Sequence, residues 1–497
     1  MLELPLHKHP SSSINNNNNS SPHNNTPTNN KHIDSRNAVV TSQRSLTYSN
    51  YYAQLIEDIG FTKQAWMVFA LASLLQFIWG QETCFISINM DYLARTKNIP
   101  QYTISLSICI LYSMMGIGSA CVGVLTKHTG RIFVLEITIL LHLLTTVLCS
   151  VISPLTFFPI MVLRCINNIA IGVFNIVVLN LMSEFFPIRN RSLVLMINSG
   201  FYNVGNLYTI LINNMNLDLK HFSTTKWKLI NLGTLIPGII AMCVVLTSIT
   251  ESPLYLLNKN RQHEGFRVLQ RMKRSALTED EQQRVMQAIT SKKNYKLKSH
   301  YSELFTKEYY KLTVLSLCIC AICYLNMVGI TYLIPKTLQN VNEVVYSVSY
   351  GMQIFIYGVI QLPNGVVGGL MTESVALGRK ITIWFSALMC GVFYFISALW
   401  MKYVAIYGGI IMLFNSICFG CAFIYVTEVF PTNLRDIAQS FIQCFSFVLG
   451  SWSPMIVNAI QYKTSYVIFG VTNVICVVLG VLLPVDTLLR PLDEDII

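Results

Sequence analysis

The chain has 497 residues, of which 53% are hydrophobic and only 12% are charged. Soluble proteins carry roughly twice that share of charged residues, so the composition excludes an ordinary water-soluble protein. The mean hydropathy of +0.50 indicates that lipid is the main solvent. The formal net charge of +11 does not indicate a nucleic-acid partner, because the basic residues lie in loops between apolar runs.

Residues 1–60 form a polar tail rich in Asn and Ser, which cannot bury enough apolar surface to fold. We expect this tail to be disordered and cytosolic. No apolar stretch follows Met1, so the sequence predicts no cleavable signal peptide. The 14 cysteines show no disulfide framework. Cys320 and Cys323 form a CxxC inside an apolar run, which we interpret as small packing residues.

The rest of the chain alternates between apolar runs and polar loops. A helix needs about 20 apolar residues to cross a bilayer. Twelve such helices are predicted, near residues 64–90, 101–125, 130–153, 156–184, 192–214, 227–249, 312–334, 346–371, 379–400, 403–428, 434–460 and 464–484. The predicted all-α membrane fold has two six-helix bundles, a loop between them and a tail: a first bundle over 61–250, a cytosolic basic loop over 251–311, a second bundle over 312–485 and a short acidic cytosolic tail over 486–497.

The central loop predicts the orientation of the chain. Residues 251–311 hold thirteen Lys and Arg against seven acidic residues. Loops rich in Lys and Arg stay on the cytosolic side, so both tails and this loop are predicted to be cytosolic. Within the loop, residues 269–289 read as an amphipathic helix near the inner leaflet. We favour a plain linker between the halves over a regulatory role.

A motif recurs half a chain apart. The segments Glu184–Arg191 and Glu428–Arg435 both read E-x-F-P-x-x-x-R, and their glutamates are 244 residues apart. A Gly-Arg pair ending at Arg131 recurs 248 residues later, ending at Arg379. Two motifs that repeat at nearly one spacing predict two halves related by an axis along the membrane normal.

Acidic and basic members of these motifs lie at predicted cytosolic helix ends, where they can pair across neighbouring loops. We predict that they form a gating latch on that face. Plain topology anchoring is the alternative, and it explains the arginines better than the repeated acids. The predicted gating residues are Arg131, Glu184, Arg191, Glu373, Arg379, Glu428 and Arg435.

With Arg164 and the segment Glu251–Leu257, these motifs resemble the major facilitator superfamily. The similar branch holds sugar porters, organic cation transporters and synaptic-vesicle-two-related proteins, and the resemblance covers about residues 55–490. Gly60-Phe61 and the segment Gly80–Glu82 are similar to the synaptic-vesicle-two-related group. The resemblance implies a twelve-helix secondary transporter that works by alternating access around one central site.

Three positions can be compared with the family pattern, and two of them depart from it. Lys127 stands where the family has Asp in the first Gly-Arg loop, whereas the second loop keeps an acid, Glu373. Trp79 stands where the family often has an Asp in the first helix. These departures predict a weaker or differently paired latch in the first half, and Trp79 argues against proton coupling.

Two charged residues lie deep inside predicted helices, where an unpaired charge costs several kcal/mol. At about 1.5 Å per residue, Glu82 lies about 10 Å and Arg164 about 12 Å from the outer surface. The matching depths predict that these side chains meet. Substrate or a proton could compete for the pair, or the pair could be a static brace. We interpret His142 as a hydrogen-bonding residue and Glu136 as part of the cytosolic charge network.

Neutral amides and aromatics on several predicted helices suit a hydroxylated, amide-bearing or planar ligand. Hydrogen bonding between helices is the alternative role for each. Asn167 and Asn415 belong to this polar set. The predicted substrate-binding residues are Glu82, Arg164, Asn168, Asn175, Tyr324, Asn326, Gln353, Tyr357, Gln361, Gln443 and Trp452. Pro335, Pro363, Gly365, Gly368 and Gly369 mark points where helices could flex.

The sequence thus predicts a secondary transporter of a small organic solute, such as an organic ion, a carboxylate or a sugar-like molecule. No catalytic, nucleotide-binding or metal-ligand spacing is evident, so we expect no enzyme activity, cofactor or metal. The expected partners are the solute, the lipid bilayer and a coupling proton or Na⁺, with the chain as a monomer in a plasma or vesicle/endosomal membrane. A non-transporting receptor or vesicle scaffold on the same fold is the alternative.

Overall fold

The computed structural model describes residues 51–97, 99–152, 157–216, 224–294, 301–345, 349–374, 376–430 and 432–484. Within these ranges every regular element is a helix. Most of the predicted N-terminal tail and the whole of the predicted C-terminal tail lie outside the described residues.

The long helices fall into two sets along the chain. The first set comprises α3 (Lys63–Lys97), α4 (Gln101–Thr129), α5 (Arg131–Val151), α6 (Phe157–Phe185), α7 (Arg191–Asn216) and α8 (Thr224–Ser248). The second set comprises α12 (Tyr310–Val345), α13 (Tyr350–Ile360), α14 (Asn364–Glu373), α15 (Gly378–Leu399), α16 (Val404–Val429), α17 (Thr432–Gly450), α18 (Ser453–Ala459) and α19 (Tyr462–Val481).

Eleven segments of the described chain are long and apolar enough to cross a membrane. The one predicted crossing helix that is missing from these eleven is α7, which has 26 residues. At about 1.5 Å per residue this length suffices to cross the hydrocarbon core. Its composition is too polar for α7 to be counted among the apolar spans, because it contains six asparagines. They are Asn198, Asn203, Asn206, Asn213, Asn214 and Asn216. The described asparagine side chains at 198, 203, 206 and 213 are buried against other helices, so they need not face lipid.

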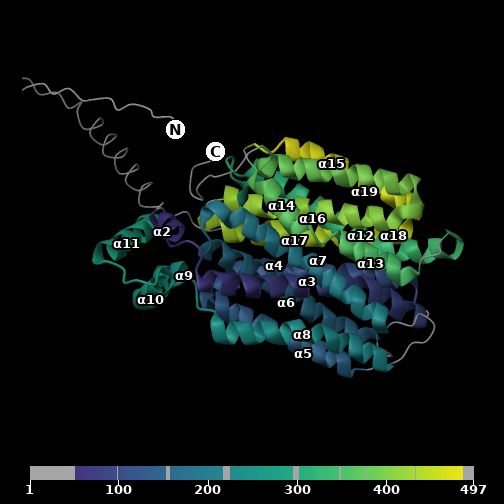
Figure 1. The fold of residues 1–497 in the computed structure, drawn as a ribbon, viewed down its shortest axis with the longest axis horizontal. Coiled ribbons are helices and arrows are strands. Elements are labelled where there is room, and N and C mark those ends of the chain that lie inside the picture. The colour runs from purple at the N-terminus through teal and green to yellow at the C-terminus, as the bar shows by residue number, and fades with distance from the viewer. Residues whose placement is uncertain are drawn as a thin grey trace, which may run out of the picture. The chain divides into compact units, whose positions relative to one another are not determined.

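The sequence repeat is reproduced in the packing. In the first set α5 packs against α6 and α8, and in the second set α15 packs against α16 and α19 in the same way. Figure 1 shows α5 and α8 on one side of the helices and α15 and α19 on the other. Between the sets, α4 packs on α17 and α18, while α7 packs on α13 and α14. Each half therefore contributes matching helices to the interface.

Two of the predicted crossing helices are broken. The first break separates α13 from α14 at Gln361–Pro363, because Pro363 lacks the N–H that would continue the helix. The second separates α17 from α18 around Ser451 and Trp452. Pro335, also predicted as a point of flexing, lies within the continuous helix α12.

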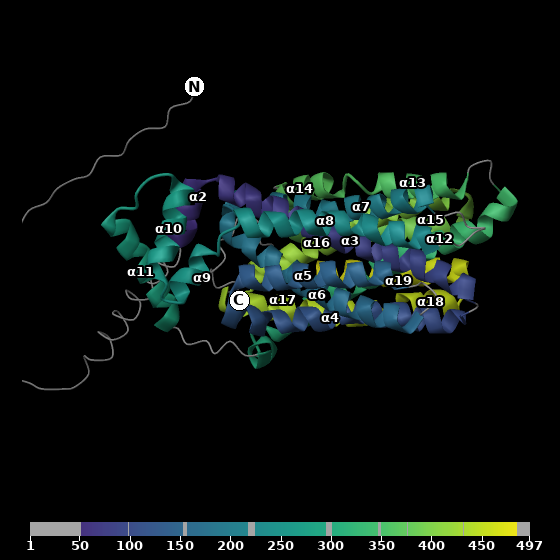
Figure 2. The same cartoon turned by 90° about the horizontal axis from the view of Figure 1, so that it is seen from below.

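Four shorter helices gather at one end of the long helices: α2 (Tyr51–Ile59), α9 (Pro253–Asn258), α10 (Gln262–Lys273) and α11 (Glu279–Asn294) (Figure 2). The single amphipathic helix predicted over residues 269–289 is wrong, since this stretch contains the end of α10 and the start of α11. Arg274 ends α10 in the left-handed conformation, with φ of 56°. Thr278 then caps α11 through two reciprocal hydrogen bonds with Glu281. The Thr278 hydroxyl accepts from the backbone amide of Glu281, and the backbone amide of Thr278 donates to the Glu281 carboxylate.

Glycines let α4 and α6 approach closely. A Cβ on Gly118 would lie 2.1 Å from the carbonyl oxygen of Ile169, and one on Gly172 would lie 2.0 Å from that of Met115. Both distances are far below van der Waals contact, so each helix fits its backbone against a glycine of the other. Small residues support this kind of packing between membrane helices.

Gly118→Val should therefore push α4 away from α6 and lower the free energy of unfolding by about 2–3 kcal/mol, as overpacking does. The measurement is the midpoint of thermal unfolding in detergent. Gly123→Val is the control on the same helix, because nothing lies within 4 Å of a Cβ at that position. Equal midpoints for the two variants would contradict the packing argument.

Candidate functional site

A cavity lies between the two sets of helices. It holds about 610 Å³ of space between atoms, part of which is open to solvent. Helices α3, α6 and α7 contribute from the first half and α12, α16 and α17 from the second. The lining residues are Gln76, Trp79, Asn175, Leu179, Leu195, Ser199, Tyr202, Met327, Ser416, Phe419, Gly420, Phe423, Ile424, Thr427 and Gln443.

The polar lining atoms are not all satisfied by the protein. The Gln76 amide donates to Asn175 Oδ1 at 2.8 Å. Gln76 Oε1, Trp79 Nε1 and Gln443 Oε1 are buried and have no hydrogen-bond partner. Buried polar groups in proteins almost always have a partner, so these atoms call for water or a ligand in the cavity. Together they offer two acceptors and one donor.

Aromatic rings from both halves surround the same region. The Trp79 ring lies 4.8 Å from that of Tyr202, within the first half. It also lies 6.1 Å from the Phe419 ring and 5.9 Å from the Phe447 ring, both in the second half. Tyr324 completes the group at 4.4 Å from Phe447. These contacts are within the usual range for aromatic pairs and join the two halves beside the cavity.

The predicted meeting of Glu82 and Arg164 is confirmed. Arg164 Nη1 donates to Glu82 Oε1 at 2.7 Å and to Oε2 at 2.6 Å. Arg164 Nη2 donates to Asn231 Oδ1 at 2.5 Å, and the guanidinium lies 4.1 Å from the centre of the Phe85 ring. Both charged side chains are only 1% exposed. The pair belongs wholly to the first half and does not line the cavity.

His142 lies on α5 with its ring buried. Its Nδ1 donates to Asn167 Oδ1 at 2.7 Å, as expected for a hydrogen-bonding histidine. Glu136, on the same helix, is half-buried.

The two Gly-Arg motifs form equivalent ion pairs. Arg131 pairs with Glu184 in the first half. Arg379 pairs with Glu428 in the second half, with Nε of the arginine 3.1 Å from Oε2 of the glutamate. The acid at the end of α6 or α16 therefore pairs with the arginine that begins α5 or α15. Arg191, by contrast, donates to the carbonyl of Phe186 at 3.3 Å.

Each ion pair also contacts the opposite half. Asp436 of α17 lies 3.9 Å from Arg131 and accepts from Asn180 of α6 at 3.0 Å. Ser192 of α7 donates to Glu428 at 3.0 Å and accepts from Arg379 at 2.5 Å.

Glu373, at the end of α14, accepts from the backbone amide of Leu193 at 3.2 Å, a further contact between the halves. Arg435 is buried at the start of α17. We refer to Arg131, Glu184, Ser192, Glu373, Arg379, Glu428 and Asp436 as the ionic network.

The segment after α8 is tied to this network. The Glu251 carboxylate accepts from the backbone amides of Arg131 and Ile132 at 3.0 and 3.2 Å, at the start of α5. Carboxylates stabilise the free amides at a helix start. Ser252 donates to Glu184, and its hydroxyl accepts from the Tyr255 amide to cap α9. The short helices therefore connect directly to the ion pair of the first half.

The other residues predicted to bind substrate occupy several places. Of the predicted set, Asn175 and Gln443 line the cavity. Asn168 donates to the backbone of Arg164 at 2.8 Å. Gln353, Tyr357 and Gln361 are buried on α13 and at its end, outside the cavity lining.

Asn326 accepts from Asn473 at 3.0 Å and Asn415 donates to the carbonyl of Cys323 at 3.0 Å, so both amides connect helices of the second half. Trp452 lies at the break between α17 and α18, with 51% of its surface exposed.

Several lining residues were absent from the sequence prediction. Gln76, Ser199 and Thr427 are polar residues within membrane-spanning helices. The same pattern was the signal by which Asn175 and Gln443 were predicted. Asp436 was missed because it directly follows Arg435 in the repeat, and only the arginine belongs to the motif.

Comparison with known proteins now identifies the family. Residues 59–495 match the family described as "Sugar (and other) transporter". The niacin transporter NiaP of Acinetobacter baylyi (strain ATCC 33305 / BD413 / ADP1) is 24% identical over 349 residues, which are 69% of this chain and 75% of the relative. The arabinose-proton symporter of Bacillus subtilis (strain 168) is 22% identical over 473 residues, which are 90% of this chain and 98% of the relative.

The solved structures agree on the fold. The inward-open xylose transporter XylE from E. coli superposes with a TM-score of 0.67 at 17% identity, covering 86% of this chain and 98% of that one. The family match covers both halves and the central loop. The chain therefore belongs to the sugar (and other) transporter family of the major facilitator superfamily, and it is a multi-pass membrane protein that carries a small organic solute by secondary transport.

Proposed function

We propose that the solute is uncharged, carries hydroxyl or amide groups beside an apolar face, and binds in the central cavity. None of the lining residues carries a charge at neutral pH. A carboxylate or ammonium entering this site would lose its hydration without gaining a counter-ion, at a cost of several kcal/mol. An uncharged solute avoids that cost.

The observation that carries this proposal is the set of unpartnered atoms on Gln76, Trp79 and Gln443. The two amide oxygens require donors and the indole N–H requires an acceptor. A hydroxyl supplies both, and an amide supplies both from neighbouring atoms. The rings of Trp79 and Phe419 supply an apolar surface on which the C–H face of a sugar ring or a planar group can stack.

The solutes named for the relatives support part of the proposed range of solutes. Arabinose, named for one relative, offers only hydroxyls and a ring. Niacin, named for the other, has a carboxylate at neutral pH, and no lining residue of this cavity would neutralise it. We therefore favour a sugar-like or amide-bearing solute over a carboxylate or an organic ion.

Both ends of α7 bind the opposite half. Ser192 near its start joins the ionic network, and Asn214 near its end donates to the backbone of Gly351 at 3.0 Å. The cavity residues Leu195, Ser199 and Tyr202 lie between these two contacts. Contacts between the two halves therefore lie on either side of these cavity residues along α7. We infer that alternating access proceeds by breaking one of these two sets of contacts at a time.

The Glu82–Arg164 pair is our candidate for coupling. A proton on Glu82 would remove the charge attraction for Arg164 and leave the arginine with neutral neighbours such as Asn231 and the Phe85 ring. The loss of that attraction in a dry site would favour another packing of α3 against α6. A proton is therefore the proposed co-substrate, in keeping with the proton symporter among the relatives.

We also propose that the ionic network lies on the cytosolic side, with both termini and the short helices. The excess of Lys and Arg in residues 251–311 supports this orientation. A plasma membrane or a vesicle/endosomal membrane and a monomeric chain remain our proposals for location and assembly.

The cavity proposal predicts that Gln443→Ala weakens binding of an uncharged hydroxylated or amide-bearing solute about fivefold to tenfold, the loss of about one hydrogen bond. A screen of candidate solutes by thermal stabilisation of the purified chain identifies the ligand, since a ligand of the native state raises the melting point. Uptake into proteoliposomes then checks transport.

Gln64→Ala is the matched control, because Gln64 lies on α3 as Gln76 does but bonds to Thr250 away from the cavity. Stabilisation by carboxylates alone would contradict the proposal. Binding without net uptake would instead favour the receptor alternative.

The coupling proposal predicts that Glu82→Gln makes uptake independent of external pH, whereas uptake by the parent chain rises as the pH falls. The glutamine keeps the shape and one acceptor for Arg164 but takes up no proton. Glu136→Gln is the control on a half-buried glutamate of α5. If Glu82→Gln lowers the melting point and leaves the pH profile unchanged, the pair is a static brace.

The closure proposal predicts that Arg379→Ala opens the end at the ionic network. Removal of one partner from a buried ion pair costs about 3–5 kcal/mol, and each 1.4 kcal/mol corresponds to a factor of ten in population. A cysteine placed at the cavity by Ser199→Cys should then react at least about tenfold faster with a membrane-impermeant maleimide added from the cytosolic side. Mass spectrometry of the peptide that contains position 199 measures the rate.

The matched control is Arg261→Ala, which removes an arginine from an exposed ion pair with Glu264. Exposed pairs contribute little, so the rate should stay at the parent value. An Arg379→Ala rate equal to that of the control would rule out the latch, and faster labelling only from the opposite side would reverse the orientation.

A further inference from the structure

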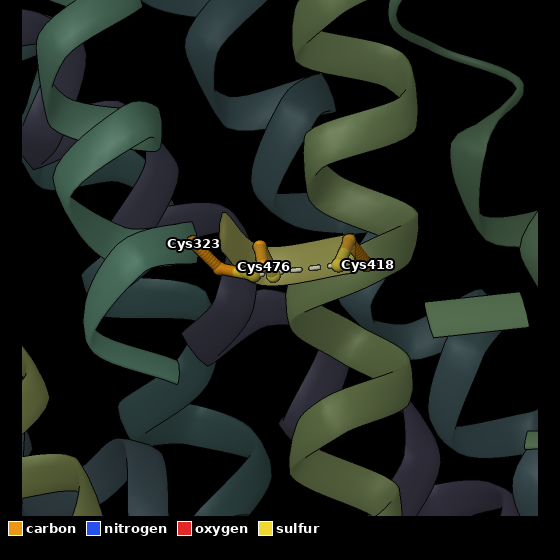
Figure 3. A group of neighbouring side chains, drawn as sticks. All are labelled: Cys323, Cys418 and Cys476. Carbon is orange, nitrogen blue, oxygen red and sulfur yellow. Dashed lines mark hydrogen bonds between the residues drawn. The ribbon is translucent and has the colours of Figure 1, made fainter. Parts of the chain in front are cut away.

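Three cysteines of the second half meet at one point inside the membrane-spanning helices. Cys323 of α12, Cys418 of α16 and Cys476 of α19 direct their sulfur atoms toward one another (Figure 3). The Sγ atoms of Cys323 and Cys418 are 3.4 Å apart, and all three lie within 4.8 Å of one another. Each side chain is at most 2% exposed.

This geometry fits three-coordinate binding of a metal. Ligand sulfurs at a metal–sulfur distance of about 2.3 Å stand about 4 Å apart in a trigonal plane. The Cys323–Cys418 separation of 3.4 Å and the upper limit of 4.8 Å for all three pairs are compatible with that value.

Hydrogen bonds one turn away hold the three helices in register. Asn415, three residues before Cys418, donates to the carbonyl of Cys323 at 3.0 Å and links α16 to α12. Asn473, three residues before Cys476, donates to Asn326 at 3.0 Å and links α19 to α12. Groups that surround a metal site in this way orient its ligands before the metal binds.

The chemistry of the donors selects the ion. Sulfur ligands favour soft metals such as Cu(I) and Zn(II). Structural zinc takes four ligands, and the group in the described part of the chain has three. A monovalent ion also needs only one thiolate for a neutral site, which suits a low-dielectric interior.

We propose that Cys323, Cys418 and Cys476 form a binding site for a soft monovalent cation, with Cu(I) as the ion and Ag(I) as a probe. Binding forms a metal–sulfur bond at one cysteine, breaks its S–H bond and releases that proton to solvent. The other two thiols bind as neutral donors, and no atom changes its oxidation state. The bound ion would connect α12, α16 and α19 and restrain their relative movement.

The test uses the full chain purified in detergent with Cu(I) supplied from a coloured competing chelator. The parent chain should retain one Cu(I) per chain, and the triple Cys→Ser variant at positions 323, 418 and 476 should bind at least tenfold more weakly. Cys390→Ser is the matched control, because Cys390 is a buried thiol of the same half that donates to the carbonyl of Ile411 outside the group. Equal retention by the parent and the triple variant would overturn the site.

A second measurement needs no variant. X-ray absorption at the copper edge of the loaded parent chain should show three sulfur neighbours at about 2.3 Å. A copper spectrum with one sulfur or none would overturn the proposal even if the triple variant failed to fold. In proteoliposomes, one equivalent of silver nitrate should slow uptake by the parent and by Cys390→Ser but leave the triple variant unaffected.

Discussion

The hydrocarbon core of a bilayer contains no water, so each charged or polar side chain placed there needs a partner from the protein or from a ligand. This constraint accounts for the hydrogen bonds of the buried Arg164. Arg164, within α6, is held by Glu82 and Asn231. Amide and indole atoms without partners line the central cavity, and others, such as those of Asn364 and Gln439, lie outside its lining. The cavity is our proposed binding site because its unpartnered atoms line a space of about 610 Å³ between the two halves.

The ionic network makes the two halves depend on each other. In each half an arginine at a helix start pairs with the glutamate that ends a neighbouring helix. The first pair takes a contact from Asp436 of the second half, and the second pair takes contacts from Ser192 of the first. The two contacts occupy equivalent positions in the halves, but one is made by the carboxylate of Asp436 and the other by the hydroxyl of Ser192. Separation of the halves at this end would therefore expose both ion pairs together, which favours a closed or an open end over intermediate states.

The fold could be predicted from the sequence because its causes are local or periodic. Long apolar runs require helices, and the repeated motifs imply two matching halves. The meeting of Glu82 and Arg164 was also predictable, since two opposite charges at one depth have few other partners. Each of these inferences needed only the position of a residue along its helix.

The cavity lining and the cysteine group were not predictable in the same way. They depend on the rotation of each helix about its axis and on which helices become neighbours. The CxxC at Cys320 and Cys323 illustrates the limit, because only Cys323 joins the group and its companions come from two other helices far along the chain. Among the predicted polar residues, Asn326 and Asn415 were cavity candidates, but they connect helices of the second half and do not line the cavity.

The asparagines of α7 have a consequence for how the protein is made. A helix with this composition gains little by leaving the translocon for lipid, so its insertion must draw on neighbours that accept its amides. Asn203 donates to the backbone at Gln361 and to Ser416, and both groups are synthesised long after α7. The Asn203 amide therefore lacks these partners until the second half has been made, and we expect substitutions at Ser416 to reduce the yield of inserted protein.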